Sequence, residues 1–368
     1  MNQPRIHGGA TDARWDFSTN ANCLGSCPAA LQAIAAADLS SYPDASYQAL
    51  IAQLAQWHGV TAQRVILGAS ASELIMRFNV ALRLLKPLES TSDHWRIAIP
   101  SPAYGDYAAS ALACGHMVCG HLLCGQTQGL QEDIADVTWL TLPSSPLGQL
   151  AAVPATPQNA LQVVDCAYLP LQLSGVPVNT TSLNNAWQIW SPNKALGLCG
   201  VRAAYAIAPQ PAPQPAPQPA LYVTPALIGG QSFEKSSQLA SLAGLVDTLR
   251  SLEPSWVLGA ASVAMLQAWT TQPVQNWLAT SRDQLRRLKA AQIAQLQHLQ
   301  IAVQPSVTNF MCIQLHTQPA EHTQRLWALR QHGIALRDTT SMGLPGWARM
   351  RVHTPEALDA FTQVWTHL

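Results

Sequence analysis

The stretch WSPNKALGLCGVR, from Trp190 to Arg202, places one lysine, Lys194, among apolar and small residues. A lysine in such surroundings must lose its charge, find a partner or react. The run AWQIW (186–190) before it is typical of a buried strand, so Lys194 follows a strand's carboxyl end. A lysine whose ammonium reaches solvent at a strand edge is the bland interpretation. Whether Lys194 is a reactive or an exposed lysine depends on which other residues lie at the same end of the sheet.

Further apolar runs have the same form, a short strand that ends in a turn or a reactive side chain. They are RVILGAS (64–70), WRIAIPSPAY (95–104), VTWLTLPSSPLG (137–148), LQVVDCAYL (161–169) and VRAAYAIA (201–208). With helical patterns at 31–37, 46–58 and 71–85, these runs predict an α/β fold whose mainly parallel sheet is covered on both faces. Ligands of such sheets bind at the strands' carboxyl ends. Residues at these ends are Ala71, Tyr104, Ser145, Asp165 and Lys194.

The C-terminal quarter of the chain predicts a smaller α+β domain. A long amphipathic helix is expected at 275–299, followed by strand-like runs at 301–315 and 348–354 with a helix between them. The expected division is an N-terminal arm with part of the small domain (1–35), a large domain (36–274) and the small C-terminal domain (275–368). A proline repeat, PQPAPQPAPQPA (209–220), opens an insertion that extends to about residue 243. It predicts an extended surface loop, which is favoured over a recognition segment.

Composition excludes several classes of protein. Lys+Arg and Asp+Glu balance at 20 each, and no basic excess or charge run indicates nucleic acid or an anionic membrane as a partner. The start, MNQPRIHGGA, lacks the apolar core of a signal peptide, and no window is long enough to span a bilayer. Eight scattered cysteines without a paired CxxC set make zinc unexpected, and no metal site is predicted. We therefore expect a cytoplasmic protein with reduced thiols.

Taken together, the residues at the strand ends resemble the fold-type I pyridoxal-phosphate enzymes of the aminotransferase class I/II superfamily, in the same order and over most of the chain. The resemblance implies that Lys194 bonds covalently to the aldehyde of pyridoxal phosphate. It also implies that Asp165 faces the pyridine nitrogen, so that the ring can accept electrons, and that Tyr168 bonds the ring hydroxyl. Lys194 and Asp165 are thus the expected catalytic residues.

The resemblance assigns the remaining positions around the cofactor and the substrate. Ser191, Arg202 and the backbone amides of Ala71 and Ser72 would bind the cofactor phosphate. Tyr104 would stack on the ring, and Arg349 would hold the carboxylate of an amino acid substrate. Tyr42, in the turn SYPD, would reach the phosphate in a partner's site, which implies a homodimer. Taken singly, Tyr104 also suits core packing, Tyr42 an ordinary turn and Arg349 a solvated surface.

The sequence departs from the family's motifs at three places. LPSSPLG (142–148) stands where the family has a form of NPNNPTG, so Ser145 replaces the asparagine that bonds the ring oxygen. Asp165–Cys166–Ala167 replaces DEA, and GASASE (68–73) replaces a GNGSDE-like turn. The change at Ser145 weakens the expected tuning of the ring and leaves open a cofactor-binding protein without turnover.

Two subfamilies compete for the reaction. HGG (7–9), WDFSTNANCLG (15–25) and GIALRDTTSMGLPGWARMRV (333–352) resemble threonine-phosphate decarboxylases of cobalamin biosynthesis. That resemblance makes His7 and Arg337 candidates for the substrate phosphate and Asn20 a substrate-side residue, although His7 also suits a disordered terminus and Asn20 a turn. Histidinol-phosphate aminotransferases share the YPD turn, the lysine block and the last arginine. The decarboxylase is the leading expectation, and the aminotransferase is the alternative.

Overall fold

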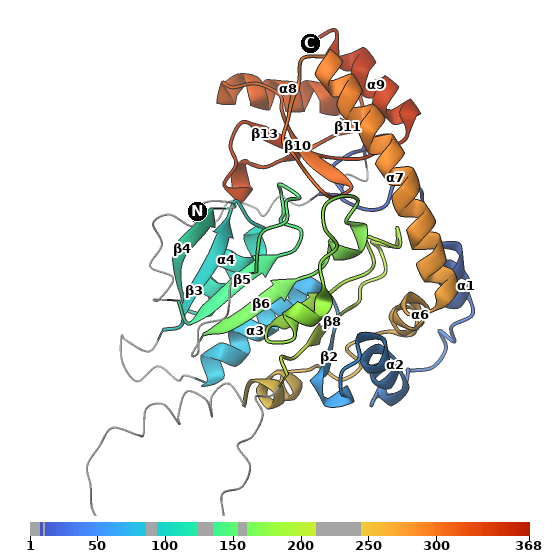
Figure 1. Cartoon of the computed structure of the whole chain (residues 1–368), viewed down its shortest axis with the longest axis vertical. Helices are drawn as coiled ribbons and strands as arrows, with labels where there is room; N and C mark the ends of the chain where they lie inside the picture. The colour runs from blue at the N-terminus through green and yellow to red at the C-terminus, as the bar shows by residue number, and fades with distance from the viewer. Residues whose placement is uncertain (1–7, 10–11, 86–93, 124–134, 154–159, 211–243) are drawn as a thin grey trace, which may run out of the picture.

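A computed structural model describes residues 8–9, 12–85, 94–123, 135–153, 160–210 and 244–368 (Figure 1). His7 lies outside the described residues. So do residues 211–220 of the proline repeat and the rest of the expected insertion to residue 243. The described chain builds one large sheet and a smaller antiparallel sheet beside it, each with its own covering helices (Figure 1).

The large sheet has seven strands in the order β2-β8-β7-β6-β5-β3-β4. The strands are β2 (Val65–Gly68), β3 (Arg96–Ser101), β4 (Met117–Leu123), β5 (Val137–Thr141), β6 (Leu161–Asp165), β7 (Trp187–Trp190) and β8 (Ala204–Ile207). From β7 to β4 every neighbouring pair is parallel, whereas β8 is antiparallel to both β7 and β2. The expected mainly parallel α/β sheet is therefore confirmed.

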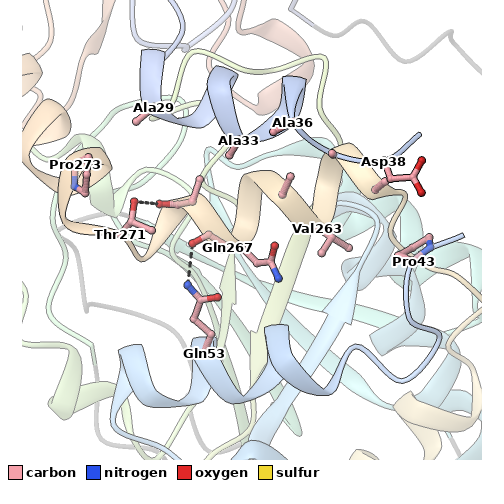
Figure 2. A pocket seen from close by; sticks show the side chains of 14 residues that line it. Ala29, Ala33, Ala36, Asp38, Pro43, Gln53, Val263, Gln267, Thr271 and Pro273 are labelled. Atoms are coloured by element: carbon pink, nitrogen blue, oxygen red, sulfur yellow. Dashed lines mark hydrogen bonds between the residues drawn. The ribbon is translucent and has the colours of Figure 1, made fainter. Parts of the chain in front are cut away.

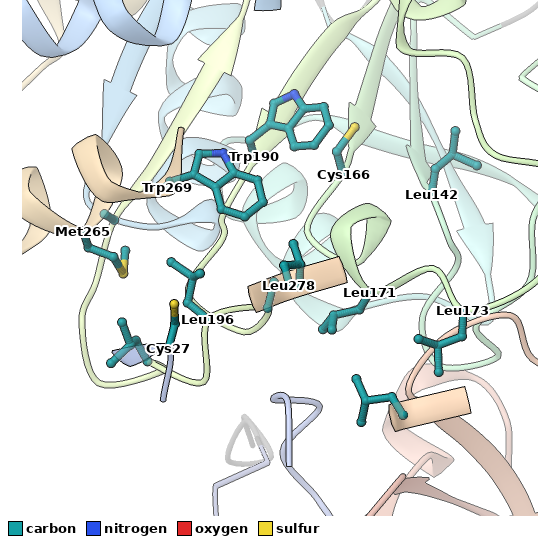
Figure 3. Close-up of a cluster of buried hydrophobic side chains, with 14 of the residues drawn as sticks. Cys27, Leu142, Cys166, Leu171, Leu173, Trp190, Leu196, Met265, Trp269 and Leu278 are labelled. Carbon is teal, nitrogen blue, oxygen red and sulfur yellow. The ribbon is translucent and has the colours of Figure 1, made fainter. Parts of the chain in front are cut away.

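Helices cover both faces of this sheet because successive strand residues point to opposite sides. In β2, Ile66 faces one core, with α3 (Ala71–Leu85), α4 (Gly105–Ala113) and the helical residues 244–251. Val65 and Leu67 face the other core. That core is covered by α1 (Pro28–Ala35), α2 (Gln48–His58), α6 (Ala260–Trp269) and α7 (Gln272–His298). Figure 3 shows its central side chains, with the indoles of Trp190 and Trp269 among them.

The smaller sheet has the order β12-β13-β10-β9, and all its neighbours are antiparallel. Its strands are β9 (Ala302–Val303), β10 (Phe310–Gln314), β12 (Arg337–Asp338) and β13 (Trp347–Arg351), and its other helices are α8 (Pro319–Gln331) and α9 (Pro355–Trp365). The N-terminal segment joins this region, because β1 (Trp15–Asp16) pairs in parallel with β11 (Ile334–Ala335). The domain boundaries at residues 35 and 274 stay a prediction.

Several elements differ from the sequence-based expectation. The helix expected at 31–37 begins at Pro28, whose fixed φ suits a first turn. The helix expected at 46–58 begins at Gln48, because Asp44 accepts hydrogen bonds from Ser46 and holds a turn there. The run expected as one strand at 301–315 divides into β9 and β10. The strands β1, β4, β11 and β12 were not expected, and each of these except β4 is only two residues long.

The 27-residue helix α7 links the cores of the two sheets. Its buried stripe includes Val274, Leu278, Leu285 and Leu296, and its other faces are polar. Within the described ranges, no helix combines the length and the apolar character needed to cross a membrane. The expected cytoplasmic location stays a prediction.

One polar residue in this stripe, Lys289, makes the stability of the fold depend on pH. Its Nζ donates to the carbonyls of Ser306 (2.5 Å) and Thr308 (2.7 Å), and burial lowers its pKa to about 8. Between pH 8 and the unfolded pKa near 10.5, the unfolded chain binds more protons, so folding becomes more favourable as pH rises. The stabilisation that Lys289 gives above pH 10.5 decreases as the pH falls and is lost once the pH has fallen through about 8.

We expect the wild-type free energy of unfolding, relative to that of Lys289→Met, to rise by up to about 3 kcal/mol from pH 8 to 10.5. Urea denaturation of both proteins across this range measures the difference. Parallel pH profiles would show that Lys289 has an ordinary pKa in the folded protein.

Candidate active site

A cavity of about 550 Å³ lies at the carboxyl end of the large sheet. Most residues singled out from the sequence line it together. They are Asn20, Ala71, Ser72, Tyr104, Ser145, Asp165, Tyr168, Ser191, Lys194, Arg202, Arg337 and Arg349. The cavity therefore collects residues from both sheets and from the N-terminal segment.

The order of the strands explains this convergence. Asp165 is the last residue of β6 and Ser191 follows β7, so their side chains meet at one edge of the parallel sheet. Arg202 reaches the same edge for the opposite reason, because it precedes β8, which runs antiparallel to β7. Ala71 is there because α3 begins immediately beyond β2.

Lys194 is held by its backbone, while its side chain enters the cavity. Its N–H bonds the Asn193 side chain (3.0 Å), and its carbonyl accepts from the Asn22 N–H (2.9 Å). A Cβ at Gly197, whose φ is +66°, would lie 2.1 Å from the Gly25 carbonyl oxygen, so only glycine lets these segments pack. Among the described residues the Lys194 ammonium has no salt-bridge partner, and it lies 5.4 Å from the centroid of the Tyr168 ring. It is free to react.

Asp165 is a buried carboxyl group with both oxygens held. The Ala167 N–H donates to Oδ1 (2.9 Å), and the Tyr107 hydroxyl donates to Oδ2 (2.7 Å). Burial raises the pKa of Asp165, and these two hydrogen bonds and the charge of Lys194 oppose the rise. A buried acid with spare lone pairs at a cavity wall suits a partner that carries a proton on nitrogen.

Two tyrosines flank Asp165 and Lys194. The Tyr168 hydroxyl accepts from Asn20 Nδ2 (3.2 Å), which places Asn20 inside the site and not in a solvent-exposed turn. The Tyr104 hydroxyl lies 3.1 Å from Ser72 Oγ and donates to Asp106 (2.7 Å). Burial raises the pKa of Tyr104, so its phenol stays protonated. Tyr104 lines the cavity instead of packing wholly into the core.

Two arginines from the smaller sheet form the opposite wall. Arg337 and Arg349 are direct cross-strand partners in β12 and β13, and both are buried. Arg349 donates to Ser145 Oγ and to the Ser18 carbonyl, each at 3.1 Å. Burial, followed by the charge of Arg349, lowers the pKa of Arg337. In the described part of the chain, neither guanidinium has a carboxylate within salt-bridge distance.

The remaining wall fits the phosphate of pyridoxal phosphate. The first N–H groups of α3, at Ala71 and Ser72, lack intrahelical acceptors and attract anions. The Ser191 hydroxyl is buried in the cavity wall without a hydrogen-bond partner among the described residues. With the Arg202 guanidinium, these donors would form a phosphate cradle, and Asp165 and Tyr168 would suit the ring nitrogen and hydroxyl. The residues present therefore fit this cofactor.

Tyr42 does not line this cavity. Its ring is 78% exposed and packs on Trp256 at 4.6 Å between centroids. The Trp256 Nε1–H donates to the Pro43 carbonyl (3.1 Å), which fixes the pair on the surface. Tyr42 therefore cannot act in the site of its own subunit. The expected role in a partner's site needs Tyr42 to be exposed in this way, and that role stays a prediction.

Sequence analysis missed several residues of the cavity. Tyr107 and Thr141 bond each other (3.0 Å) behind Asp165, and Gly8, Gly9 and Asn193 also line the wall. Tyr107 had a detectable signal, because it stands three residues after Tyr104, where residues at the start of a helix share a face. Gly8 and Gly9 belong to the HGG opening, whose resemblance to the decarboxylases was used above, but only its histidine was named as a site residue.

A larger depression, of about 730 Å³, lies between α1, α2 and α6 (Figure 2). Half of the residues that line it are alanines. The Gln53 side chain of α2 donates to the Gln267 carbonyl of α6, and the Thr271 hydroxyl donates to the Ala268 carbonyl. Among the described residues that line it, Asp38 is the only ionisable one, so we assign the chemistry to the smaller cavity around Lys194, where several ionisable side chains converge.

Comparison with known proteins gives consistent matches. The family model for aminotransferase class I and II matches residues 15–364. A histidinol-phosphate aminotransferase from Erythrobacter litoralis is 26% identical over 96% of this chain and 91% of its own. Among solved structures, a histidinol-phosphate aminotransferase from Clostridium acetobutylicum superposes with a TM-score of 0.74 at 17% identity, covering 96% of this chain and 100% of that one. An L-threonine-O-3-phosphate decarboxylase from Porphyromonas gingivalis gives 0.71 at 17% identity, covering 95% and 98%.

Proposed function

The chain belongs to the aminotransferase class I and II family, whose members use pyridoxal phosphate, and on that premise we propose that it transfers the amino group of a small phosphorylated amine such as histidinol phosphate. The proposal revises the order of the two reactions expected from the sequence. The full-length relative from Erythrobacter litoralis carries the aminotransferase name, which supports the former alternative over the decarboxylase.

The observation that carries the substrate class is the arginine pair. Arg337 and Arg349 face the cavity side by side without acidic partners among the described residues, so their charges are available to a ligand. Two adjacent buried guanidiniums repel each other, and burial leaves them little water. A phosphate group satisfies both through charge-assisted hydrogen bonds, which a neutral side chain cannot do.

The other residues would divide the work as follows. When bound, pyridoxal phosphate supplies an electron-accepting ring that weakens the bonds at an attached amine's carbon. The Lys194 amine holds the cofactor and, when free, moves a proton at the substrate's α-carbon. Asp165 holds the proton on the ring nitrogen. Tyr168, with Asn20, bonds the ring hydroxyl, while Ser145 orients Arg349.

A decarboxylase acting on a phosphorylated amino acid is the second candidate. It is favoured by the HGG opening, since Gly8 and Gly9 line the cavity and Gly9 N–H bonds Ser18 (3.0 Å). This contact supports the second candidate, because it holds the N-terminal segment, which resembles the decarboxylases, at the wall of the cavity. His7 stays a candidate for the substrate phosphate on the sequence alone.

Purified protein with added pyridoxal phosphate should be tested with histidinol phosphate plus 2-oxoglutarate and, separately, with phosphothreonine. We expect glutamate from the first mixture and little carbon dioxide from the second. Histidinol without its phosphate is the matched control, and its KM should be at least about tenfold higher. Carbon dioxide without glutamate would establish the decarboxylase, and neither product would contradict both substrate assignments.

We also propose that the protein is a homodimer in which Tyr42 completes the partner's phosphate cradle. Support comes from the exposed apolar surface formed by Leu39, Tyr42 and Trp256, which would be unfavourable in water. The alanine-lined depression adjoins it at Asp38 and Pro43 (Figure 2). A two-fold contact would place the same patch of both subunits face to face.

Mixing Tyr42→Ala with Lys194→Ala subunits tests this arrangement. In a heterodimer, one site has both defects and the other has neither, so activity should recover to about a quarter of wild type after random exchange of equal amounts. Activity before and after exchange is measured, with exchange verified by mass-tagged subunits. No recovery despite exchange would leave Tyr42 as an ordinary surface residue.

A further inference from the structure

We infer that Tyr107 is a positioning residue for the cofactor, whose hydroxyl fixes the Asp165 carboxylate against the bound ring nitrogen. The inference rests on the proposed role of Asp165. Neither the motifs nor the comparisons assign a role to Tyr107. The proposed role explains how Asp165 stays a charged carboxylate although it is buried.

The geometry shows a short chain of hydroxyl groups that ends on Asp165. Tyr107 donates its one hydroxyl proton to Asp165 Oδ2 (2.7 Å), so at the 3.0 Å contact with Thr141 the threonine must be the donor. Thr141 is the register partner of Asp165 in the neighbouring strand β5, which places it beside the carboxylate. Each bond in such a chain strengthens the next.

The aromatic ring of Tyr107 is fixed as firmly as its hydroxyl. It is fully buried in α4, stacks on Trp139 at 5.1 Å and meets Tyr104 edge-on at 5.8 Å. These contacts hold the ring whether or not the hydroxyl is present. Tyr107→Phe therefore removes the hydrogen bond alone and leaves the packing of the ring intact.

Electrostatics around Asp165 show why the bond matters. Burial raises the pKa of Asp165 and thereby favours a neutral acid, and the Tyr107 bond is the first of the influences that oppose it. The other charged or titratable neighbours are Lys194, which also lowers the pKa of Asp165, and Cys166, whose own pKa burial raises. The pKa of Tyr107 lies well above its usual value because of burial and the adjacent charge, so the phenol remains a donor at neutral pH.

The test compares Tyr107→Phe with Tyr205→Phe. Tyr205, on β8, is equally buried. Its hydroxyl bonds His58 (2.9 Å) and Trp269 (3.2 Å) and not Asp165. Apoprotein of each variant is titrated with pyridoxal phosphate between pH 5 and 9, and the dissociation constant is read from the visible absorption. Loss of a hydrogen bond to a charged group should weaken binding roughly tenfold to a hundredfold in Tyr107→Phe only.

The pH profile gives a second readout that altered packing would not move. Without the Tyr107 bond the pKa of Asp165 rises, so affinity should begin to fall at a pH about one unit higher than in wild type as the solution is acidified. In an Asp165→Ala background, which has no acceptor for the Tyr107 hydroxyl, Tyr107→Phe should cause no further loss, because the two residues act through one contact.

The outcomes separate this inference from the proposed function. Wild-type affinity and pH profile in Tyr107→Phe, or an equal loss in the Asp165→Ala background, would overturn the role of Tyr107 while leaving the enzyme assignment intact. A matching loss in Tyr205→Phe would show a general packing effect and would also overturn it. A wild-type protein that binds no pyridoxal phosphate would remove both the function and this inference.

Discussion

Replacing Lys194 with alanine should lower turnover by roughly a thousandfold or more while leaving the fold intact. The side chain enters the cavity and has no salt bridge within the described residues, so its loss removes chemistry and not packing. The backbone bonds at Asn22 and Asn193 that shape its loop do not use the side chain of Lys194. Melting temperature should change little, whereas kcat should collapse.

Covalent labelling identifies the residue directly. Borohydride reduction of the protein loaded with pyridoxal phosphate should fix the cofactor to the peptide that contains Lys194, and the Lys194→Ala protein should remain unlabelled. Lys289→Met is the matched control, because Lys289 is a buried lysine bound to backbone carbonyls away from the cavity. Label on Lys86, Lys235 or Lys289 in the wild type would contradict the assignment.

Removing the charge of Asp165 should have the second largest effect. In Asp165→Asn we expect kcat/KM to fall about a hundredfold or more, because a charge-assisted hydrogen bond to the ring nitrogen contributes on the order of 1.5–3 kcal/mol and the ring also becomes a poorer electron acceptor. The fold should survive, since the amide oxygen can still accept from Tyr107 or from the Ala167 N–H.

Asp165→Ala separates this catalytic loss from structural damage. It leaves the Tyr107 hydroxyl and the Ala167 N–H buried without their acceptor, so it should lower the free energy of unfolding by about 1–3 kcal/mol more than Asp165→Asn does. Steady-state kinetics and thermal unfolding of both variants provide the comparison. Near-normal kcat/KM in Asp165→Asn would exclude Asp165 from the chemistry.

The residues at strand ends were predictable because the signal was local. The buried β6 is a short run that is apolar apart from Gln162, and the acid at its end, Asp165, is conspicuous in a chain with few charges. Lys194 stands out for the same reason. Because the strands are parallel, their carboxyl ends must meet at one edge of the sheet. The sequence alone could therefore predict most of the residues with which the large sheet lines the cavity.

Other parts of the site depend on contacts that local pattern does not encode. Arg337 and Arg349 are paired through β12, a strand of two residues that is too short to show alternation. The spacing of Tyr107 from Tyr104 could place it on the same helix face, but only the structure shows that its hydroxyl bonds Asp165. Arg202 reaches the site because β8 runs backward, and direction relative to a neighbour cannot be read from a single strand.

The pairing of β1 with β11 has a consequence for the synthesis of the protein. Trp15 leaves the ribosome about 300 residues before its partner Ile334, and Phe17 must likewise wait for Arg351, whose N–H donates to the Phe17 carbonyl. The segment that carries Asn20 therefore lacks these partners until β11 and β13 have been synthesised, and contacts so distant in sequence form slowly. A chain stalled or truncated before β13 would have Lys194 in place but would lack one wall of its pocket.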